Sequence, residues 1–539
     1  MGNTHLEGRI LNEETKRWLY RIWMAAIVAF ALLHALHLKA DFPNHSPWFS
    51  DWAKYTDEGW YGDAAMRAHL LGHWYQAGDL NTAVALPVLP FLEWVLFFFT
   101  GVSVVAARGL AVGFFCANLV LSYLLLRRRT PRWAGLLAVT LLATSPFYYC
   151  FSRLAILEQP LTALLLAALN VAVRLKEWRR PVVAASGLGL LFALMMLTKT
   201  TAVFLLPALG WALMVDLWED RRQMLRCAAA LLGTAGIVYA GWLALIAHAG
   251  LMADYHYLFF INKYPKPHEI YWPLVSLRWS INGGFWVGHI LFPLAAAVVA
   301  GAVVAHKREW GRGLLTDPVF GASVWAVVGY IGFMAYQNHP QPRYFAVVAL
   351  FSFLLVAQGA AALLHDCYGA GGDRRRRLGW ALIVLAGVAA LNGAVRVARF
   401  ALHPQYSFVQ AAEGLTNYID AHPNGNRLLL SISADEITLV THLPGLCDDF
   451  GTVELPNKTQ AAQPGWYAAW NDLDPGTLED LHLHFSLEQV ASFRAFDDPE
   501  RNVLVLFKLH PLPAGETRDY GDGDLRNPLP DDKIDIPIE

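Results

Sequence analysis

The sequence predicts a polytopic α-helical membrane protein with about eleven transmembrane helices and a small C-terminal α/β domain outside the membrane. Of its 539 residues, 55% are hydrophobic and 16% are charged, whereas soluble domains have about 25% charged residues. Residues 1–399 hold 34 Lys and Arg against 21 Asp and Glu, and residues 400–539 hold 8 against 23. This composition excludes a disordered chain, a collagen and a nucleic-acid-binding protein.

Apolar runs of transmembrane length recur along residues 1–399, which we take as the membrane domain; a spanning helix needs about 20 such residues. They lie near residues 19–39, 104–126, 133–151, 156–173, 182–198, 201–217, 227–247, 286–305, 319–336, 344–364 and 378–397. The first run leads into aromatic, charged sequence without a small-residue cleavage site. We therefore expect a retained helix rather than a signal peptide.

Basic clusters occupy every second loop and orient the predicted helices. They lie at residues 127–132, 174–180, 221–226, 307–312 and 374–377. Because loops rich in Lys and Arg stay in the cytoplasm, the N-terminus is expected there, and an odd number of spans places the acidic C-terminal domain outside. Arg-rich inner loops on a compact chain favour a bacterial inner membrane, with the C-terminal domain in the periplasm.

Two long loops are expected on the outer face, at residues 40–106 and 248–285. The first is rich in Trp, Tyr, His and carboxylates, and then turns apolar in LPVLPFLEWVLFFFTG. That apolar stretch contains Pro87 and Pro90 and is short for a span, so we expect a re-entrant or interfacial segment. Long loops that are not disordered are usually functional.

The α/β domain is expected over residues 400–512. A helix-like FVQAAEGLTNYIDAHP precedes strand-like RLLLSIS, WYAAW, QVASFRAF and NVLVLFKL, with helix-like DPGTLEDL between them. Alternating apolar residues in short segments predict the strands. No glycine-rich phosphate motif follows any of them, so nothing indicates nucleotide binding. Residues 513–539 have the Pro, Gly and Asp content of a disordered tail.

Ionisable residues gather near the predicted outer ends of helices, where they are costly unless they serve a function. They are Asp57 and Glu58 in YTDEGWYGD, Arg153 and Glu158 in SRLAILEQPLT, Lys199 in MLTKTTAVFLLP, and His339 and Arg343 in NHPQPRYF. A carboxylate with several cations is the set that deprotonates a nucleophile and holds a phosphate leaving group. Structural interpretations also exist, since Arg153 and Glu158 can simply pair and Lys199 can reach toward headgroups.

The order of these segments resembles the lipid-phosphosugar-dependent glycosyltransferases of the GT-C fold. The resemblance rests on TDEGWYGDAA, VVAARGLAVGFF, SRLAILEQPLTALLLAAL, LTKTTAVFLLPAL and PRYFAVVALFSFLL, over about residues 15–365. The subgroup it is most similar to is the protein O-mannosyltransferase and lipid A aminoarabinose transferase superfamily. The resemblance implies an inverting transfer of a sugar from a polyprenyl-phosphate donor to a hydroxyl of a lipid, glycan or protein acceptor.

The resemblance also implies roles for individual residues. Asp57 matches the base that activates the acceptor, with Glu58 as its neighbour. Lys199 and Arg343, with Arg153 and then His339 ranked below them, are expected at the donor phosphate. Glu158 stands where relatives often have Asp. No cofactor is expected to be obligatory, although Asp51 and Asp63 are carboxylates that a divalent metal could use.

Other classes of protein stay open at this point. A lipid-linked sugar flippase or other transporter would also have many helices, but transporters tend to contain inverted repeats, and we find no repeat in this sequence. A receptor or scaffold would explain the outer domain without chemistry. Within the enzymes, a ligase that uses diphosphate-linked glycans is the alternative.

Overall fold

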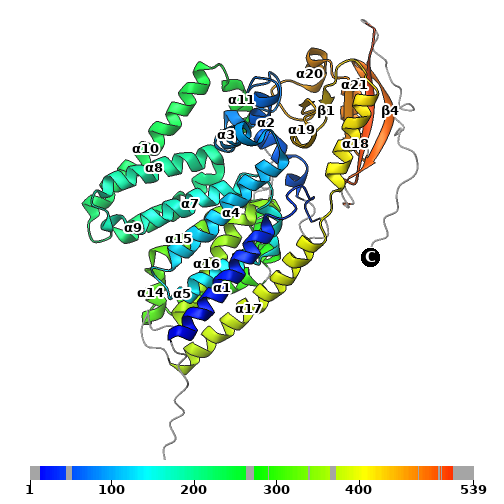
Figure 1. Cartoon of the computed structure of the whole chain (residues 1–539). Coiled ribbons are helices and arrows are strands. Elements are labelled where there is room, and N and C mark those ends of the chain that lie inside the picture. Colours follow the sequence, from blue (N-terminus) through cyan, green and yellow to red (C-terminus); the bar gives the residue numbers. More distant parts are fainter. Residues whose placement is uncertain are drawn as a thin grey trace, which may run out of the picture.

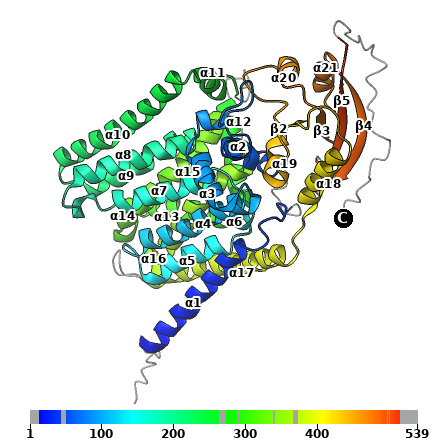
Figure 2. The same cartoon turned by 45° about the horizontal axis from the view of Figure 1, so that its top comes forward.

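The chain is mostly helical, with a small mixed α/β part at one end of the helical body (Figures 1 and 2). A computed structural model describes residues 13–43, 51–262, 272–288, 290–337, 340–364, 372–471, 473–495, 498 and 501–513. The predicted tail at 513–539 lies outside the described residues except for its first residue.

Within the described residues, seventeen α-helices precede the mixed part. They are α1 (Glu13–His34), α2 (Asp57–Leu70), α3 (Val88–Thr100), α4 (Val104–Leu126), α5 (Arg132–Ala143), α6 (Pro146–Phe151), α7 (Glu158–Ala172), α8 (Pro181–Thr198), α9 (Leu206–Asp216), α10 (Arg221–His248), α11 (Met252–His256), α12 (Trp272–Gly288), α13 (Leu291–Val304), α14 (Glu309–Leu315), α15 (Pro318–Gln337), α16 (Phe345–Leu364) and α17 (Asp373–Leu402). Short helices named η1 (Trp52–Lys54), η4 (Thr200–Leu205) and η6 (Pro342–Tyr344) lie between them.

Each of the eleven predicted runs falls on one helix or on two successive helices, which confirms a polytopic helical fold. Within the described ranges, six helices are long and apolar enough to cross a membrane, or seven if the bent pair α13 and α14 counts as one span. The prediction of eleven crossings therefore stays a prediction. The run at 133–151 is not one helix, because Ser145 accepts a hydrogen bond from the Tyr148 N–H and starts α6, with Pro146 as its first residue.

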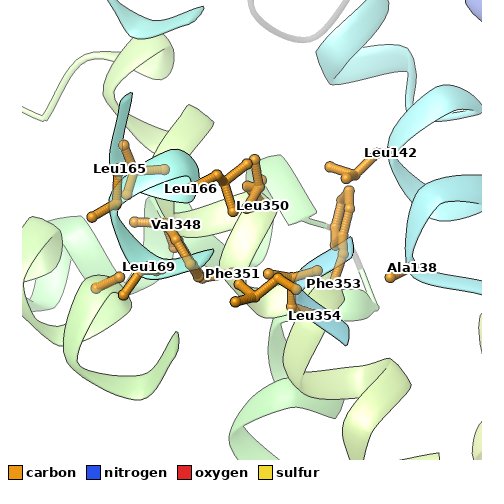
Figure 3. Close-up of a cluster of buried hydrophobic side chains, with 14 of the residues drawn as sticks. Ala138, Leu142, Leu165, Leu166, Leu169, Val348, Leu350, Phe351, Phe353 and Leu354 are labelled. Atoms are coloured by element: carbon orange, nitrogen blue, oxygen red, sulfur yellow. The ribbon is translucent and has the colours of Figure 1, made fainter. Parts of the chain in front are cut away.

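Helix α16 is the centre of the membrane part. Every residue from Phe345 to Ala362 is buried, and α16 contacts α13, α15, α17 and α5. Figure 3 shows the apolar side chains that α16 directs toward α7 on one side, among them Leu350 and Phe351, and toward α5 on the other. A helix that is apolar all round in this way has to be enclosed by other helices.

The first outer loop contains two helices. Helix α2 packs against α3, and α3 is the segment expected to be re-entrant or interfacial. The two prolines do not prevent a helix there, because Pro87 is the N-cap of α3 and Pro90 lies in its first turn, where backbone N–H groups have no partner within the helix. The sequence analysis did not anticipate α12 in the second loop.

The mixed part, which we call the C-terminal part (residues 407–513), contains a five-stranded sheet. Its helices are α18 (Ser407–Ala421), α19 (Ala434–Thr441), α20 (Leu455–Ala462) and α21 (Pro475–His482), and its strands are β1 (Leu429–Leu430), β2 (Gly445–Leu446), β3 (Trp466–Trp470), β4 (Phe485–Arg494) and β5 (Val503–Pro511). The strand order is β2-β1-β3-β5-β4. Strand β1 is parallel to β2 and β3, and β5 is antiparallel to β3 and β4.

The C-terminal part contacts the first outer loop through α19, which packs against α2 (Figures 1 and 2). The His442 ring lies 2.9 Å from the Val102 carbonyl, and the Cys447 N–H donates to Asp79. The sequence predicted an α/β unit over residues 400–512 but gave no indication of where it docks. Its division from residues 1–399 as a separate domain stays a prediction.

Candidate active site

Asp57 is the first residue of helix α2 and is almost completely buried, with 1% of its surface exposed. The N-terminal end of a helix carries partial positive charge, which stabilises a carboxylate placed there. Burial acts in the opposite direction and raises the pKa of Asp57 above its usual range, while the Arg343 guanidinium counters that rise. The Asp51 and Glu158 charges add to the rise and Lys199 also opposes it, so the proton affinity of Asp57 is set by burial and by all the charges around it.

Arg343 lies in η6, immediately before the buried helix α16. Its Nη1 donates to Asp51 Oδ1 at 2.6 Å, and its backbone N–H donates to Asp51 Oδ2 at 2.8 Å. Its Nε lies 3.0 Å from Asp57 Oδ2, but neither atom makes a hydrogen bond within the described residues. Asp51 thus holds Arg343 by one hydrogen bond to the guanidinium and one to the backbone, and Asp57 contacts the guanidinium as an ion pair.

Lys199 follows the last residue of α8 and forms an ion pair with Glu158, the first residue of α7. Glu158 is fully buried and Lys199 is 6% exposed. The Lys199 Nζ lies 4.4 Å from the centre of the Tyr344 ring, and the Arg343 guanidinium carbon lies 5.1 Å from it. Both cations therefore lie within cation–π distance of the Tyr344 ring.

Four of the predicted site residues thus meet in one cluster, which we call the central cluster: Asp57, Glu158, Lys199 and Arg343, with Asp51 and Tyr344. They come from segments far apart in the sequence. Its formal charges are two cations against three carboxylates. Such an arrangement can accept a proton at Asp57 and attract an anion toward Lys199 and Arg343.

Glu58 does not point into the central cluster. Its carboxylate binds Arg108 of α4, with Nε to Oε1 at 2.8 Å and Nη2 to Oε2 at 2.5 Å, and it accepts the Ala155 N–H at 2.8 Å. Neighbouring residues on a helix point about 100° apart, so Asp57 and Glu58 face different partners. Glu58 fixes α2 to α4 and to the segment before α7.

Arg153 and His339 also differ from the other predicted residues. The Arg153 guanidinium stacks on the Tyr149 ring at 4.6 Å and donates to the His37 carbonyl at 2.5 Å. Among the contacts that the structure describes, none joins Arg153 to the central cluster. His339 lies outside the described residues.

The two carboxylates considered for a metal lie in different surroundings. Asp51 is hydrogen-bonded to Arg343, and Asp63 pairs with Arg67 at 3.4 Å. Over the described ranges, no group of three or more His, Cys, Asp or Glu side chains is arranged to hold a metal ion. Arg343 forms ion pairs with both the Asp51 and the Asp57 carboxylates.

Three features of the cluster were missed by the sequence analysis. Tyr344 follows Arg343 directly, and Tyr61 lies four residues after Asp57 on the same face of α2, close enough for the Asp57 charge to contribute to the raised pKa of Tyr61, whose main cause is burial. The spacing in YTDEGWYGD would have indicated Tyr61. Asp51 was considered only as a metal ligand, and nothing in the sequence indicated its pairing with Arg343.

Comparison with known proteins identifies the fold. The family model described as dolichyl-phosphate-mannose-protein mannosyltransferase matches residues 84–248. The crystal structure of ArnT from Cupriavidus metallidurans bound to undecaprenyl phosphate is 14% identical, with a TM-score of 0.59, over 90% of this chain and 98% of that one. The archaeal oligosaccharyltransferase AglB from Archaeoglobus fulgidus, in complex with an inhibitory peptide and a dolichol-phosphate, is 12% identical, with a TM-score of 0.50, over 92% of this chain and 74% of that one.

A search of curated protein sequences finds no match. The structural matches confirm the GT-C fold that the sequence resemblance implied, in a multi-pass membrane protein. The family match supports glycosyl transfer as the class of activity. It includes Arg108, Glu158 and Lys199 and begins after Asp57.

Proposed function

Because the chain has the GT-C fold of membrane glycosyltransferases, we propose that it is an inverting glycosyltransferase that moves a sugar from a polyprenyl-phosphate donor to an acceptor hydroxyl. The observation that carries the proposal is the position of Asp57, whose Oδ2 accepts no hydrogen bond from the described residues and lies beside Arg343. A carboxylate oxygen with an unused lone pair beside a phosphate-binding cation is what the reaction requires.

In the proposed reaction, Asp57 takes the proton of the acceptor hydroxyl, and the acceptor oxygen attacks the anomeric carbon of the sugar. The bond between that carbon and the phosphate oxygen breaks, and both electrons leave with polyprenyl phosphate. The attack and the departure occur on opposite faces, so the configuration inverts. Phosphate is a good leaving group at neutral pH, so the main need is stabilisation of its added negative charge by Lys199 and Arg343.

The charges of the central cluster set a condition on donor binding. Lys199 is paired with Glu158 and Arg343 with Asp51 in the structure, so a phosphate must share cations that already have partners. Glu158 and Asp51 then orient the cations rather than neutralise them fully. The apolar side of the donor is expected to lie in the bilayer, next to the membrane helices.

The site is expected on the outer face of a bacterial inner membrane, with the N-terminus in the cytoplasm and the C-terminal part in the periplasm. The alternation of basic loops supports this orientation. The acceptor is a hydroxyl of a lipid, glycan or protein. The proposed step needs no metal ion, and we therefore expect chelation by EDTA to leave the rate unchanged.

The test uses the full chain in lipid nanodiscs with radiolabelled polyprenyl-phosphate sugars, and it measures the release of polyprenyl phosphate. Asp57→Asn should lower the rate by about 10²–10⁴-fold, as expected for loss of a general base, and should leave donor binding intact. Arg343→Lys keeps the charge but loses the planar fork, so it should weaken donor binding as well.

Asp220→Asn is the matched control. Asp220 is an exposed N-cap of α10 that accepts from the Gln223 N–H, and Asn caps helices as well as Asp does. Equal rates for Asp57→Asn and the parent would refute the assignment of the base. Absence of release by the parent from every monophosphate donor, with donor binding intact, would refute the proposed reaction and favour a flippase or a diphosphate-linked glycan ligase.

A further inference from the structure

Helix α19 of the C-terminal part lies directly against the first turn of α2, the helix that begins with Asp57. The contact is between backbones and occurs at Gly59. A Cβ atom at this position would lie 2.8 Å from the Glu436 Cα and closer still to other backbone atoms of Asp435 and Glu436. Those atoms belong to the backbone and cannot move aside as the end of a side chain can, so only glycine allows α19 to approach this closely.

At the same point, the Gly59 N–H donates to Glu436 Oε2 at 2.7 Å. Gly59 is the third residue of α2, and its N–H is one of the groups that an N-cap side chain normally satisfies. The N-cap of α2 is Thr56, whose side chain makes no capping hydrogen bond. The acceptor for the first turn of α2 is therefore supplied by Glu436, 377 residues further along the chain.

Glu58 also holds the first turn of α2 in place. Its hydrogen bonds to Arg108 and to the Ala155 N–H fix the turn to α4 and to the segment before α7. The first turn of α2 is thus fixed by two neighbouring carboxylates, Glu58 of the turn itself and Glu436 of α19. Asp57 directly precedes Glu58 and Gly59, and among the described residues its carboxylate is held by the ion pair with Arg343 and a 3.3 Å contact from the Thr56 hydroxyl.

We propose that Glu436 is a positioning residue for the glycosyl transfer: it caps the first turn of α2 and so sets the direction in which Asp57 points. This inference rests on the proposed function. It gives the C-terminal part a specific task, which is to complete the active-site helix from outside the membrane. Displacement of a reacting group by about 1 Å can lower a rate by about 10²-fold, so loss of this cap affects the chemical step.

Burial raises the pKa of Glu436 well above its usual range, and the neighbouring Glu58 carboxylate adds to the rise. A protonated carboxyl is mimicked by an amide of the same shape. Glu436→Gln keeps an oxygen that can accept from the Gly59 N–H, whereas Glu436→Ala removes it. Comparing these two variants distinguishes the need for a hydrogen-bond acceptor at position 436 from the need for a negative charge there.

The experiment compares the parent, Glu436→Ala, Glu436→Gln and the control Glu413→Ala, all as full chains in nanodiscs. Glu413 is an exposed carboxylate on α18 of the same C-terminal part. Two measurements are made: kinetics of polyprenyl-phosphate release as a function of pH, and hydrogen–deuterium exchange of the peptide that contains Gly59.

For Glu436→Ala we expect kcat to fall by about tenfold or more with the KM for the donor unchanged, because Lys199 and Arg343 are untouched. Amide exchange at the first turn of α2 should be faster by about tenfold or more, since its N–H loses the acceptor. Glu436→Gln should behave like the parent in both measurements, and so should Glu413→Ala.

Unchanged kcat and unchanged exchange in Glu436→Ala would overturn the inference. So would an equal loss of kcat in Glu436→Gln, because that result would indicate a need for the carboxyl itself rather than for the acceptor. If the parent releases no polyprenyl phosphate, the proposed function fails, and the exchange measurement still tests whether Glu436 caps α2.

Discussion

Asp51→Asn tests how the Arg343 guanidinium is held. Asp51 Oδ1 accepts from Arg343 Nη1 at 2.6 Å and from the Ala53 N–H at 2.8 Å, and Asp51 Oδ2 accepts from the Arg343 backbone N–H at 2.8 Å. Asparagine keeps the shape and one acceptor, but its NH2 group faces the other donor and the negative charge is lost. One of the two hydrogen bonds to Arg343 is therefore broken, and Arg343 is left with Asp57 as its charged partner.

The size of the effect follows from the bond that is lost. A hydrogen bond that involves a charged group contributes about 1.5–3 kcal/mol, and about 1.4 kcal/mol corresponds to a tenfold change in rate. If Arg343 stabilises the leaving phosphate, kcat/KM should fall by about tenfold to a hundredfold. The fall should be smaller than that for Asp57→Asn, because the guanidinium remains in the site.

The pH dependence has a defined sign. The negative charge of Asp51 is one of the causes that raise the pKa of Asp57, after burial. Asp51→Asn removes that charge, so the pKa of Asp57 should fall. Because Asp57 must be deprotonated to act as a base, the acidic limb of the pH–rate profile should move to lower pH even though the maximal rate decreases.

The assay is the pH–rate profile of polyprenyl-phosphate release by the parent and Asp51→Asn, with Asp220→Asn as the control that should match the parent. A variant with the parental rate, or one whose acidic limb moves to higher pH, would refute the reasoning. The first result would indicate that Asp51 does not orient Arg343, and the second that Asp57 is not the titrating base.

Three further predictions concern stability. Lys199→Met leaves the buried Glu158 without its cation, which should lower the free energy of unfolding by about 3–5 kcal/mol and so lower Tm. The double variant with Glu158→Gln should regain the Tm of the parent but not its release of polyprenyl phosphate. Gly59→Ala should lower Tm by forcing α2 and α19 apart. The control Gly210→Ala in α9, where an added Cβ has open space around it, should raise Tm slightly. Similar changes in Tm for the two variants would contradict the close contact between α2 and α19. Burial raises the pKa of Asp435 from 3.8 to about 7, so the folded state binds a proton more tightly than the unfolded state. The Tm should therefore fall as pH rises from 5 to 8. Asp435→Asn should make this fall smaller, and an unchanged dependence of Tm on pH would contradict the raised pKa of Asp435.

The membrane helices were well predicted because apolar length is a local property of the sequence. The run at 104–126 coincides with α4, and each of the other runs lies on one helix or on two successive helices. The split between α5 and α6 was missed because a hydropathy run does not detect a Ser145 cap followed by Pro146. Helix α19 was missed because its eight residues are too few for a clear periodicity.

The candidate site was predicted only in part, for a different reason. Asp57, Glu158, Lys199 and Arg343 of the central cluster were found because ionisable groups next to apolar runs are conspicuous, and their roles stay predictions. Partnerships could not be predicted: Glu58 pairs with Arg108 rather than joining Asp57, and Asp51 pairs with Arg343. Such pairings depend on how helices pack, and the spacing of residues in one segment carries no information about it.

The position of the site residues along the chain has a consequence for biosynthesis. Asp57 is made early, whereas Arg343 precedes the enclosed helix α16 and Glu436 lies beyond the last of the long apolar helices. Helix α16 can take its central place only by leaving lipid and entering a group of helices inserted before and after it. The proposed site is therefore complete only in a chain whose translation has passed residue 436.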